Sequence, residues 1–250
     1  MVQGRQHGFD TARAAFFGGS RESIGTPAFI LAVSFLGFGS MLRESGWSLW
    51  VGLLSTLTTW ALPGQIAMLE FYETGGGVVV IALAVGLTNA RLLPMVVSLL
   101  PMIRHPRWPR WTHFFLSHLI AVTSWVNVMA RAPSLSQDQR IPYFTGFALT
   151  LWTASLVSTV IGYYIAGTLP RPVTLGLLFF NPLYFLLVPL LGLGSVVRLM
   201  AIILGGVLGP TLYLVTPDWG LLLTGLIGGT AAFLIGRKWD GRRLIERGDA

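Results

Sequence analysis

The stretch VVVIALAVGLTNARLLPMVVSLLP, residues 78–101, carries a single charge, that of Arg91. A helix rises about 1.5 Å per residue, so roughly 20 apolar residues cross the hydrocarbon core of a bilayer, which is about 30 Å thick. The stretch is therefore long enough to span a membrane, and Arg91 then lies near the bilayer midplane. An unpaired arginine at that depth costs at least about 2.5–3.5 kcal/mol. We expect Arg91 to have either a partner or a binding role.

The composition of the whole chain is that of a membrane protein. Of its 250 residues, 53% are hydrophobic and 11% are charged, whereas soluble domains carry about 25% charged residues. The net charge of +7 does not indicate a nucleic-acid partner, because the basic residues gather at the chain ends and in the loop 104–113. Cytoplasmic loops of membrane proteins have this distribution. The chain has no cysteine, so disulfides and thiolate metal sites are excluded, and we expect no metal or other cofactor.

Apolar segments alternate with short loops along the chain and predict an all-α polytopic membrane protein. The eight segments are 24–42, 47–72, 77–101, 112–130, 144–167, 173–191, 196–214 and 219–236. They form one transmembrane domain, residues 24–236, between an N-terminal tail (1–23) and a basic C-terminal tail (237–250). A disordered N-terminal tail is favoured over a helix that lies in the membrane interface.

Two of the segments contain a helix breaker at mid-length, ALPGQ (61–65) and FFNPL (179–183). If all eight segments crossed the membrane, the basic loop after residue 103 would lie opposite the basic N-terminus, against the positive-inside rule. Re-entrant segments at 47–72 and 173–191 remove this conflict and place both termini in the cytoplasm. The alternative is that both prolines only kink ordinary spanning helices.

With two re-entrant segments, the chain has six full spans in two halves, about 24–130 and 144–236. Each half then contains three crossings and one broken element, which makes the two halves inverted with respect to each other. Inverted halves are common in secondary transporters, whose substrates bind near the midplane at broken helices.

Arg91 has two interpretations. It either pairs with Glu70 of the preceding segment, or it holds the carboxylate of a small solute through its planar two-donor guanidinium. Pro94 has no amide hydrogen, so we also expect an unpaired carbonyl at Ala90, beside the arginine.

The two breakers predict half-helices whose N-termini attract anions. One begins at Pro63 and presents the amides of Gly64, Gln65 and Ile66, and the other begins at Pro182, after Asn181. Gln65 and Asn181 are candidates for substrate binding, with simple capping of the helix ends as the alternative. The segment 112–130 adds two polar residues, Thr123 and Ser124, to the candidate site.

The sequence does not predict an enzyme. It has no HExxH or GxSxG motif, and no acidic residue in the segment of His118 that would orient this histidine as a base.

Three motifs resemble the AzlC-type branched-chain amino-acid permease family, the large subunits of branched-chain amino-acid exporters. FLGFGSMLRESGWS (35–48) is similar to the family's first helix, WALPGQIAMLE (60–70) stands at the place of F-A-G-S-A-Q-F, and TNARLLPMVVSLLPMIR (88–104) resembles V-N-x-R-H-L-L-Y followed by L-A-P-x-x-R. The likeness covers about residues 24–190. Gln65, Asn89 and Arg91 occupy matching positions, so the resemblance implies that all three bind substrate.

The chain also departs from the family pattern. The histidine after the arginine is Leu92, the serine before the glutamine is Pro63, and the T-D-E of the fourth helix reads Thr123-Ser124-Trp125. Where many members have an aspartate before the later F-x-x-P, this chain has Leu178. Of the carboxylates near the membrane, Glu70 is the candidate for coupling.

The expected function is a secondary transporter in the cytoplasmic membrane that exports branched-chain or other small apolar amino acids. The resemblance implies a small membrane subunit of the AzlD type as partner, besides the bilayer and the amino-acid substrate. The alternatives are a channel-like facilitator of small solutes and a non-transporting scaffold for a partner subunit.

Overall fold

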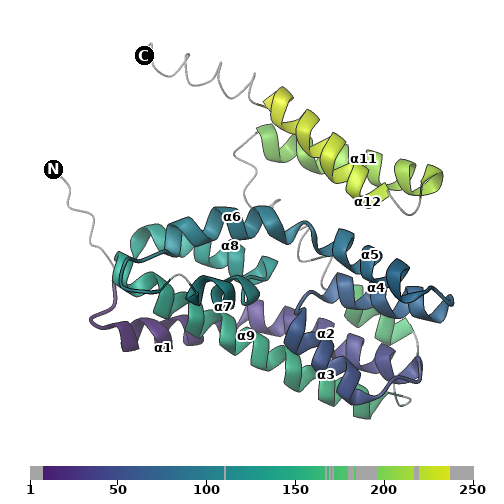
Figure 1. Ribbon diagram of the computed structural model, residues 1–250, viewed down its shortest axis with the longest axis horizontal. Helices are drawn as coiled ribbons and strands as arrows, with labels where there is room; N and C mark the ends of the chain where they lie inside the picture. Colours follow the sequence, from purple (N-terminus) through teal and green to yellow (C-terminus); the bar gives the residue numbers. More distant parts are fainter. Residues whose placement is uncertain are drawn as a thin grey trace. The chain divides into compact units, whose positions relative to one another are not determined.

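The computed structural model of the chain describes residues 8–109, 111–166, 168, 170, 172–179, 183, 196–216 and 220–236. The regular structure of these residues is entirely helical (Figure 1). They belong to two compact units, Met1–Phe180 and Asn181–Ala250. In chain order the first unit contains α1 (Ala12–Ser23), α2 (Thr26–Glu44), α3 (Leu49–Thr58), α4 (Leu62–Glu73), α5 (Val78–Asn89), α6 (Leu92–Ile103), α7 (Thr112–His118), α8 (Val122–Arg131), the 3₁₀ turn η1 (Ala132–Ser134), α9 (Gln137–Ile165) and a helical stretch at 172–179.

The long helix α9 is the centre of the first unit, and α2 packs along it in backbone contact. A Cβ atom on Gly39 would lie 2.2 Å from the carbonyl oxygen of Thr159, and one on Gly162 would lie 2.0 Å from that of Leu36. No side chain fits at either position, so the two glycines allow the helices to approach closely, as small residues do between membrane helices. Glu22, just before α2, accepts a hydrogen bond from Tyr143 near the start of α9. Trp47, just after α2, accepts one from Tyr163 near the end of α9, so the two helices run parallel.

Residues 12–23 of the N-terminal segment form helix α1, so the expectation of a disordered tail is wrong for this part. Thr11 caps the helix by accepting a hydrogen bond from the amide of Ala14 at 3.1 Å. The helix packs on α9, where Gly19 meets the backbone of Tyr143 and the Tyr143 hydroxyl donates to Glu22 at 2.6 Å. Packing on α9 gives α1 a tertiary partner that the local sequence does not reveal.

The second apolar segment is broken into α3 and α4, as its Leu-Pro-Gly motif predicts. Pro63 stands in the first turn of α4, where its missing amide hydrogen costs nothing. At the break Trp60 has φ +38°, a left-handed conformation that is rare for a bulky residue. The two ends of the segment meet, because the rings of Trp47 and Tyr72 lie 4.6 Å apart. The segment therefore returns to the end from which it started.

The third segment is bent by 47° between α5 and α6, and Arg91 lies at the bend. The expected unpaired carbonyl at Ala90 is a wrong prediction, because it accepts a hydrogen bond from the amide of Leu93 at 3.1 Å. Pro94 cannot supply the usual bond to this carbonyl. The preceding residue supplies it instead through a tighter turn.

The fourth segment was expected to cross without interruption, and this expectation is wrong. Its helices α7 and α8 are bent by 113°. The segment also returns to its starting end, because Gln137 at the start of α9 donates to the carbonyl of Arg104, at the end of α6, at 3.0 Å. A hydrogen bond from Nε2 of His105 to the carboxylate of Asp138 at 2.9 Å joins the same two ends.

Within the described residues, α2 and α9 are each long and apolar enough to cross a membrane, and the bent pairs α5–α6 and α7–α8 pass the same test as pairs. Large apolar side chains such as Val78, Leu83 and Phe114 lie exposed on these helices. A surface of this kind suits lipid better than water. The chain is thus consistent with a helical membrane protein.

The second unit contains a helical hairpin of α11 (Val196–Val215) with α12 (Gly220–Leu223), the π-helical turn η2 (Thr224–Gly228) and a continuation to residue 236. The two arms of this helical hairpin run antiparallel, because a Cβ on Gly236 would lie 2.3 Å from the side chain of Val197, while Gly220 packs on Tyr213. The predicted break at Asn181 and Pro182 and the basic tail 237–250 lie outside the described residues.

Candidate functional site

The tips of the second and fourth segments touch each other. Nε2 of His118, the last residue of α7, lies 2.7 Å from the carbonyl oxygen of Leu57 in the last turn of α3. A carbonyl oxygen only accepts, so Nε2 carries the proton. The indole of Trp152 donates to the neighbouring carbonyl of Thr56 at 3.3 Å. Side chains from two other elements thus satisfy carbonyls that the end of α3 leaves free.

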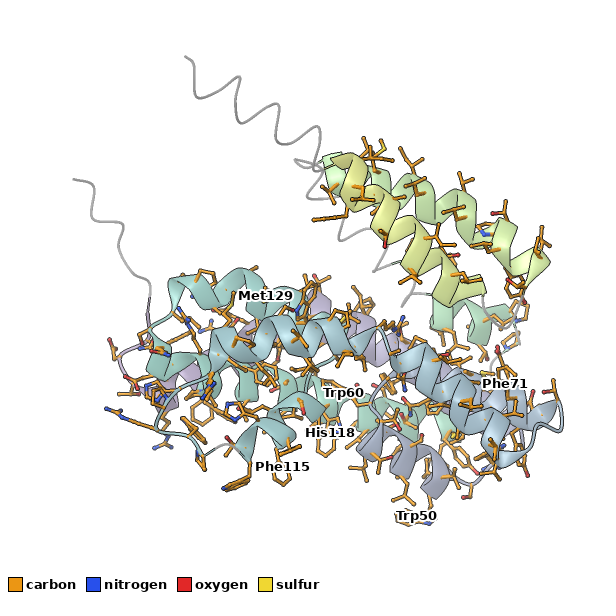
Figure 2. The ribbon with its side chains drawn as sticks, turned by 45° about the horizontal axis from the view of Figure 1, so that its top comes forward. Trp50, Trp60, Phe71, Phe115, His118 and Met129 are labelled. Atoms are coloured by element: carbon orange, nitrogen blue, oxygen red, sulfur yellow. The ribbon has the colours of Figure 1, made fainter. Side chains whose placement is uncertain are left out.

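This contact lies beside the middle of α9. Trp152 stands near the midpoint of the helix, and its ring meets the ring of His118 edge to face at 6.4 Å. One turn later, Ser155 accepts a hydrogen bond from the indole of Trp60 at 3.1 Å. Figure 2 labels Trp60 and His118, one from each of the two broken segments. The breaks of both segments therefore meet halfway along the longest helix.

The start of α4 packs directly on the end of α5. A Cβ atom on Gly64 would lie 2.5 Å from both the nitrogen and the oxygen of the Asn89 side-chain amide. Only a glycine leaves room for the amide at this place. Gly64 and Asn89 therefore lie in contact, Gln65 is the chain neighbour of Gly64, and Arg91 follows two residues after Asn89.

Three of the predicted residues carry buried polar atoms without a partner in the described part of the chain. These atoms are Oε1 of Gln65, Oδ1 of Asn89 and Nε of Arg91. A buried polar atom without a hydrogen bond costs about 1–3 kcal/mol. Such atoms are rare in folded proteins and point to a ligand or to water. The candidate site is defined by Gly64, Gln65, Asn89 and Arg91, and their roles in binding stay a prediction.

The backbone amide of Gln65 is not available to a ligand. It donates to the carbonyl of Ala61 at 3.1 Å, so the expectation that this amide presents itself to an anion is wrong. Its side chain is 1% exposed and belongs to the site instead.

The remaining predicted residues do not join this group through any described contact. Thr123 and Ser124 are buried at the start of α8. The Ser124 hydroxyl accepts from the amide of Ala121 at 3.0 Å and thereby holds the break of the fourth segment. Glu70 is exposed on α4, and the ion pairs of the described residues do not include it or Arg91. Asn181 lies outside the described residues.

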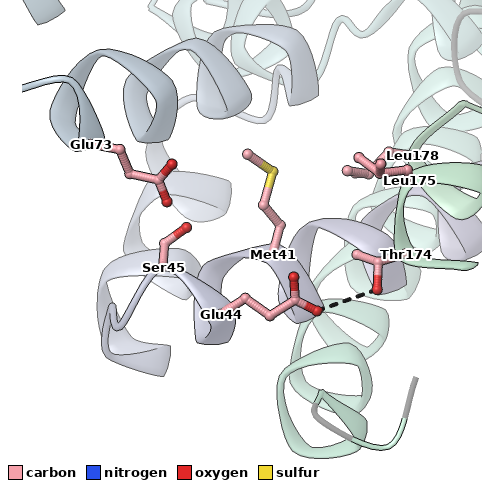
Figure 3. Close-up of a pocket in the computed structure, with 7 residues that line it drawn as sticks. All are labelled: Met41, Glu44, Ser45, Glu73, Thr174, Leu175 and Leu178. Atoms are coloured by element: carbon pink, nitrogen blue, oxygen red, sulfur yellow. Dashed lines mark hydrogen bonds between the residues drawn. The ribbon is translucent and has the colours of Figure 1, made fainter. Parts of the chain in front are cut away.

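A cavity of about 300 Å³ lies where the ends of α2 and α4 meet the helical stretch 172–179 (Figure 3). Its lining residues are Met41, Glu44, Ser45, Glu73, Thr174, Leu175 and Leu178. Glu44 accepts hydrogen bonds from the hydroxyls of Ser40 at 3.3 Å and Thr174 at 3.4 Å. No sequence pattern connects residues so far apart, and this cavity was not predicted.

A protein-family model described as "AzlC protein" matches residues 27–169, which is more than half of the chain and lies within the first compact unit. No curated protein and no solved structure matches the chain.

Proposed function

The chain belongs to the AzlC family, which is associated with branched-chain amino-acid transport, and we propose that it is a secondary transporter of the cytoplasmic membrane that exports branched-chain or other small apolar amino acids. The observation that carries this proposal is the group of unpartnered buried atoms on Gln65, Asn89 and Arg91. They lie at the bend of one segment and at the break of another. Transporters bind their substrates at such interruptions near the midplane.

The proposed topology has two re-entrant segments in the first unit, the second (47–72) and the fourth (112–130). Both return to their starting ends, and they do so at opposite ends of α9. Basic residues lie near the start of α9, namely Arg104, Arg107, Arg131 and Arg140. Acidic residues Glu44 and Glu73 line the cavity at the other end, where Arg43 stacks on Tyr163. The positive-inside rule then places the start of α9 in the cytoplasm.

This topology is tested by labelling single cysteines, for which the cysteine-free chain is a ready background. A cysteine at position 74 is expected to react from outside the cell, and one at position 106 from the cytoplasm. Access to both positions from the same side contradicts the re-entrant second segment.

In the proposed mechanism, Arg91 holds the substrate carboxylate. Its guanidinium offers two parallel N–H donors, and a carboxylate accepts both. The breaks at 59–61, 90–91 and 119–121 interrupt the helical hydrogen bonds and act as hinges that expose the site to either side in turn. We assign supporting contacts with the substrate to Thr123 and Ser124, and ion coupling to Glu70.

The experiment that tests the proposal measures counterflow of labelled L-leucine in proteoliposomes. Arg91→Lys is expected to lose most of the counterflow while the protein still folds, because lysine keeps the charge but not the two-donor geometry. Arg107→Lys is the matched control, because the Arg107 side chain is 80% exposed and distant in sequence from the site. Normal counterflow by Arg91→Lys at normal expression refutes the carboxylate role.

A channel-like facilitator is the second candidate, because in a channel two broken segments that touch at their tips can line the pore. Saturable counterflow distinguishes a carrier from a channel, whose uptake rises linearly with concentration. The small AzlD-type subunit and the scaffold role stay predictions, and co-purification with such a subunit tests both.

A further inference from the structure

The orientation of the Gln65 side-chain amide follows from the hydroxyl groups around it. Its Nε2 lies 2.8 Å from Oγ of Ser55 and 2.9 Å from Oγ1 of Thr56. Each hydroxyl has one proton, and each already donates it to the carbonyl of Gly52, at 2.8 and 2.9 Å. Both oxygens can therefore only accept, and the two N–H bonds of Nε2 match them.

With Nε2 directed at the two hydroxyls, the oxygen of the Gln65 side-chain amide has no hydrogen-bond donor. Turning the amide over would leave two buried N–H donors unpaired instead of one acceptor, which costs more. Oε1 of Gln65 is thus held as a free acceptor on a side chain that is 1% exposed. Oδ1 of Asn89 is a second buried acceptor without a described partner, on the residue that packs against Gly64.

We propose that Gln65 and Asn89 form a neutral subsite that accepts hydrogen bonds from the α-ammonium group of the substrate. The inference rests on the proposed function and adds the other half of the substrate. Arg91 is a donor without acceptors, and the two amide oxygens are acceptors without donors. Together they match a zwitterion, with its carboxylate on the arginine and its ammonium on the amides. No carboxylate takes part, so ammonium binding does not require an acidic side chain in this group.

The subsite predicts how the protein discriminates between ligands. A site built to accept hydrogen bonds rejects an analogue that lacks the donor, because its own buried groups then stay unpaired. We expect L-leucine to bind at least about tenfold more tightly than 4-methylpentanoate, which has the same carbon chain and carboxylate but no ammonium. We expect 3-methylbutylamine, which has the ammonium but no carboxylate, to bind weakly as well.

The test is a binding titration of the purified full chain with these three compounds. Gln65→Met removes the acceptor while both hydroxyls keep their bonds to Gly52. It is expected to weaken leucine binding about tenfold or more and to leave 4-methylpentanoate binding unchanged. Arg91→Lys is expected to weaken both carboxylates and to leave 3-methylbutylamine unchanged. If Gln65→Met does not fold, Asn89→Leu tests the second acceptor with the same expected pattern.

Two outcomes separate failure of the subsite from failure of the proposed function. Equal loss of leucine and 4-methylpentanoate binding in Gln65→Met, or no loss at all, overturns the subsite, since a merely structural residue affects both ligands alike. Absence of leucine binding to the unaltered protein instead contradicts the amino-acid transporter itself.

Discussion

The contact between Gly64 and Asn89 gives the sharpest prediction, because one added methyl group tests the geometry of the whole site. In Gly64→Ala the new Cβ atom would lie 2.5 Å from the Asn89 amide, whereas ordinary contacts begin at 3.4 Å. The amide must therefore move by about 0.9 Å. The atoms in the way belong to the end of a side chain, so a shift of the Asn89 side chain away from its ideal rotamer, at a cost of about 0.5–1.5 kcal/mol, relieves the clash.

The expected result is a folded protein that has lost its function. Alanine is favoured over glycine in a helix by about 0.5–1 kcal/mol, which offsets most of the rotamer cost, so the free energy of unfolding changes by less than about 1 kcal/mol. A displacement of about 1 Å in a site can cost up to about 100-fold in rate. Leucine counterflow in proteoliposomes is therefore expected to fall at least about tenfold, at nearly unchanged thermal stability.

Two further variants make this prediction specific. At Gly86, in the same helix as Asn89, an added Cβ atom meets nothing within 4 Å, so Gly86→Ala is expected to transport normally. In an Asn89→Ala background, Gly64→Ala is expected to add no further loss, because the amide that it displaces is gone. Normal counterflow by Gly64→Ala, or an equal additional loss in the Asn89→Ala background, would refute the reasoning.

Three other substitutions test the frame around the site. Gly39→Ala places its Cβ 2.2 Å from the backbone oxygen of Thr159, which cannot rotate away. We expect it to lose at least about 1–3 kcal/mol of stability, measured by thermal unfolding in detergent. His118→Leu removes the donor to the Leu57 carbonyl, so we expect about 0.5–1.5 kcal/mol lower stability and slower counterflow, with unchanged counterflow as the contrary result. Ser124→Ala leaves the amide at the start of α8 unpaired and is expected to cost about 1–3 kcal/mol, while Ser124→Thr keeps the hydroxyl and serves as its control.

The sequence allowed the break of the second segment to be predicted because proline and glycine act locally. Pro63 cannot continue a helix and is suited to begin one, and the structure begins α4 at the preceding residue. Arg91 was identified for an equally local reason, as a single charge in an apolar run. The prediction that Gln65 and Asn89 bind substrate relied on the family resemblance as well, since polar residues also cap helix ends.

The break of the fourth segment could not be predicted in this way. Residues 119–121 read Leu-Ile-Ala and contain neither proline nor glycine. The bend is held by the Ser124 hydroxyl and by the His118 contact with the carbonyl of Leu57, 61 positions earlier in the chain. The ends of the segment are joined by a hydrogen bond from His105 to Asp138. Contacts across such distances in sequence leave no local signature, and the ordering of α1 on α9 escaped prediction for the same reason.

The glycine contacts of α9 also restrict which parts of the protein can move during transport. Where Gly39 and Gly162 seat one backbone directly on another, no layer of flexible side chains remains to let the helices slide. Interlocked main chains of this kind move as one body. The α2–α9 pair then serves as the stationary frame. The interrupted segments move when the binding site opens, because their bends already lack part of the hydrogen bonding that stiffens a helix. A spin-label pair across α2 and α9 should accordingly keep its distance through the cycle while a pair across α4 and α7 changes.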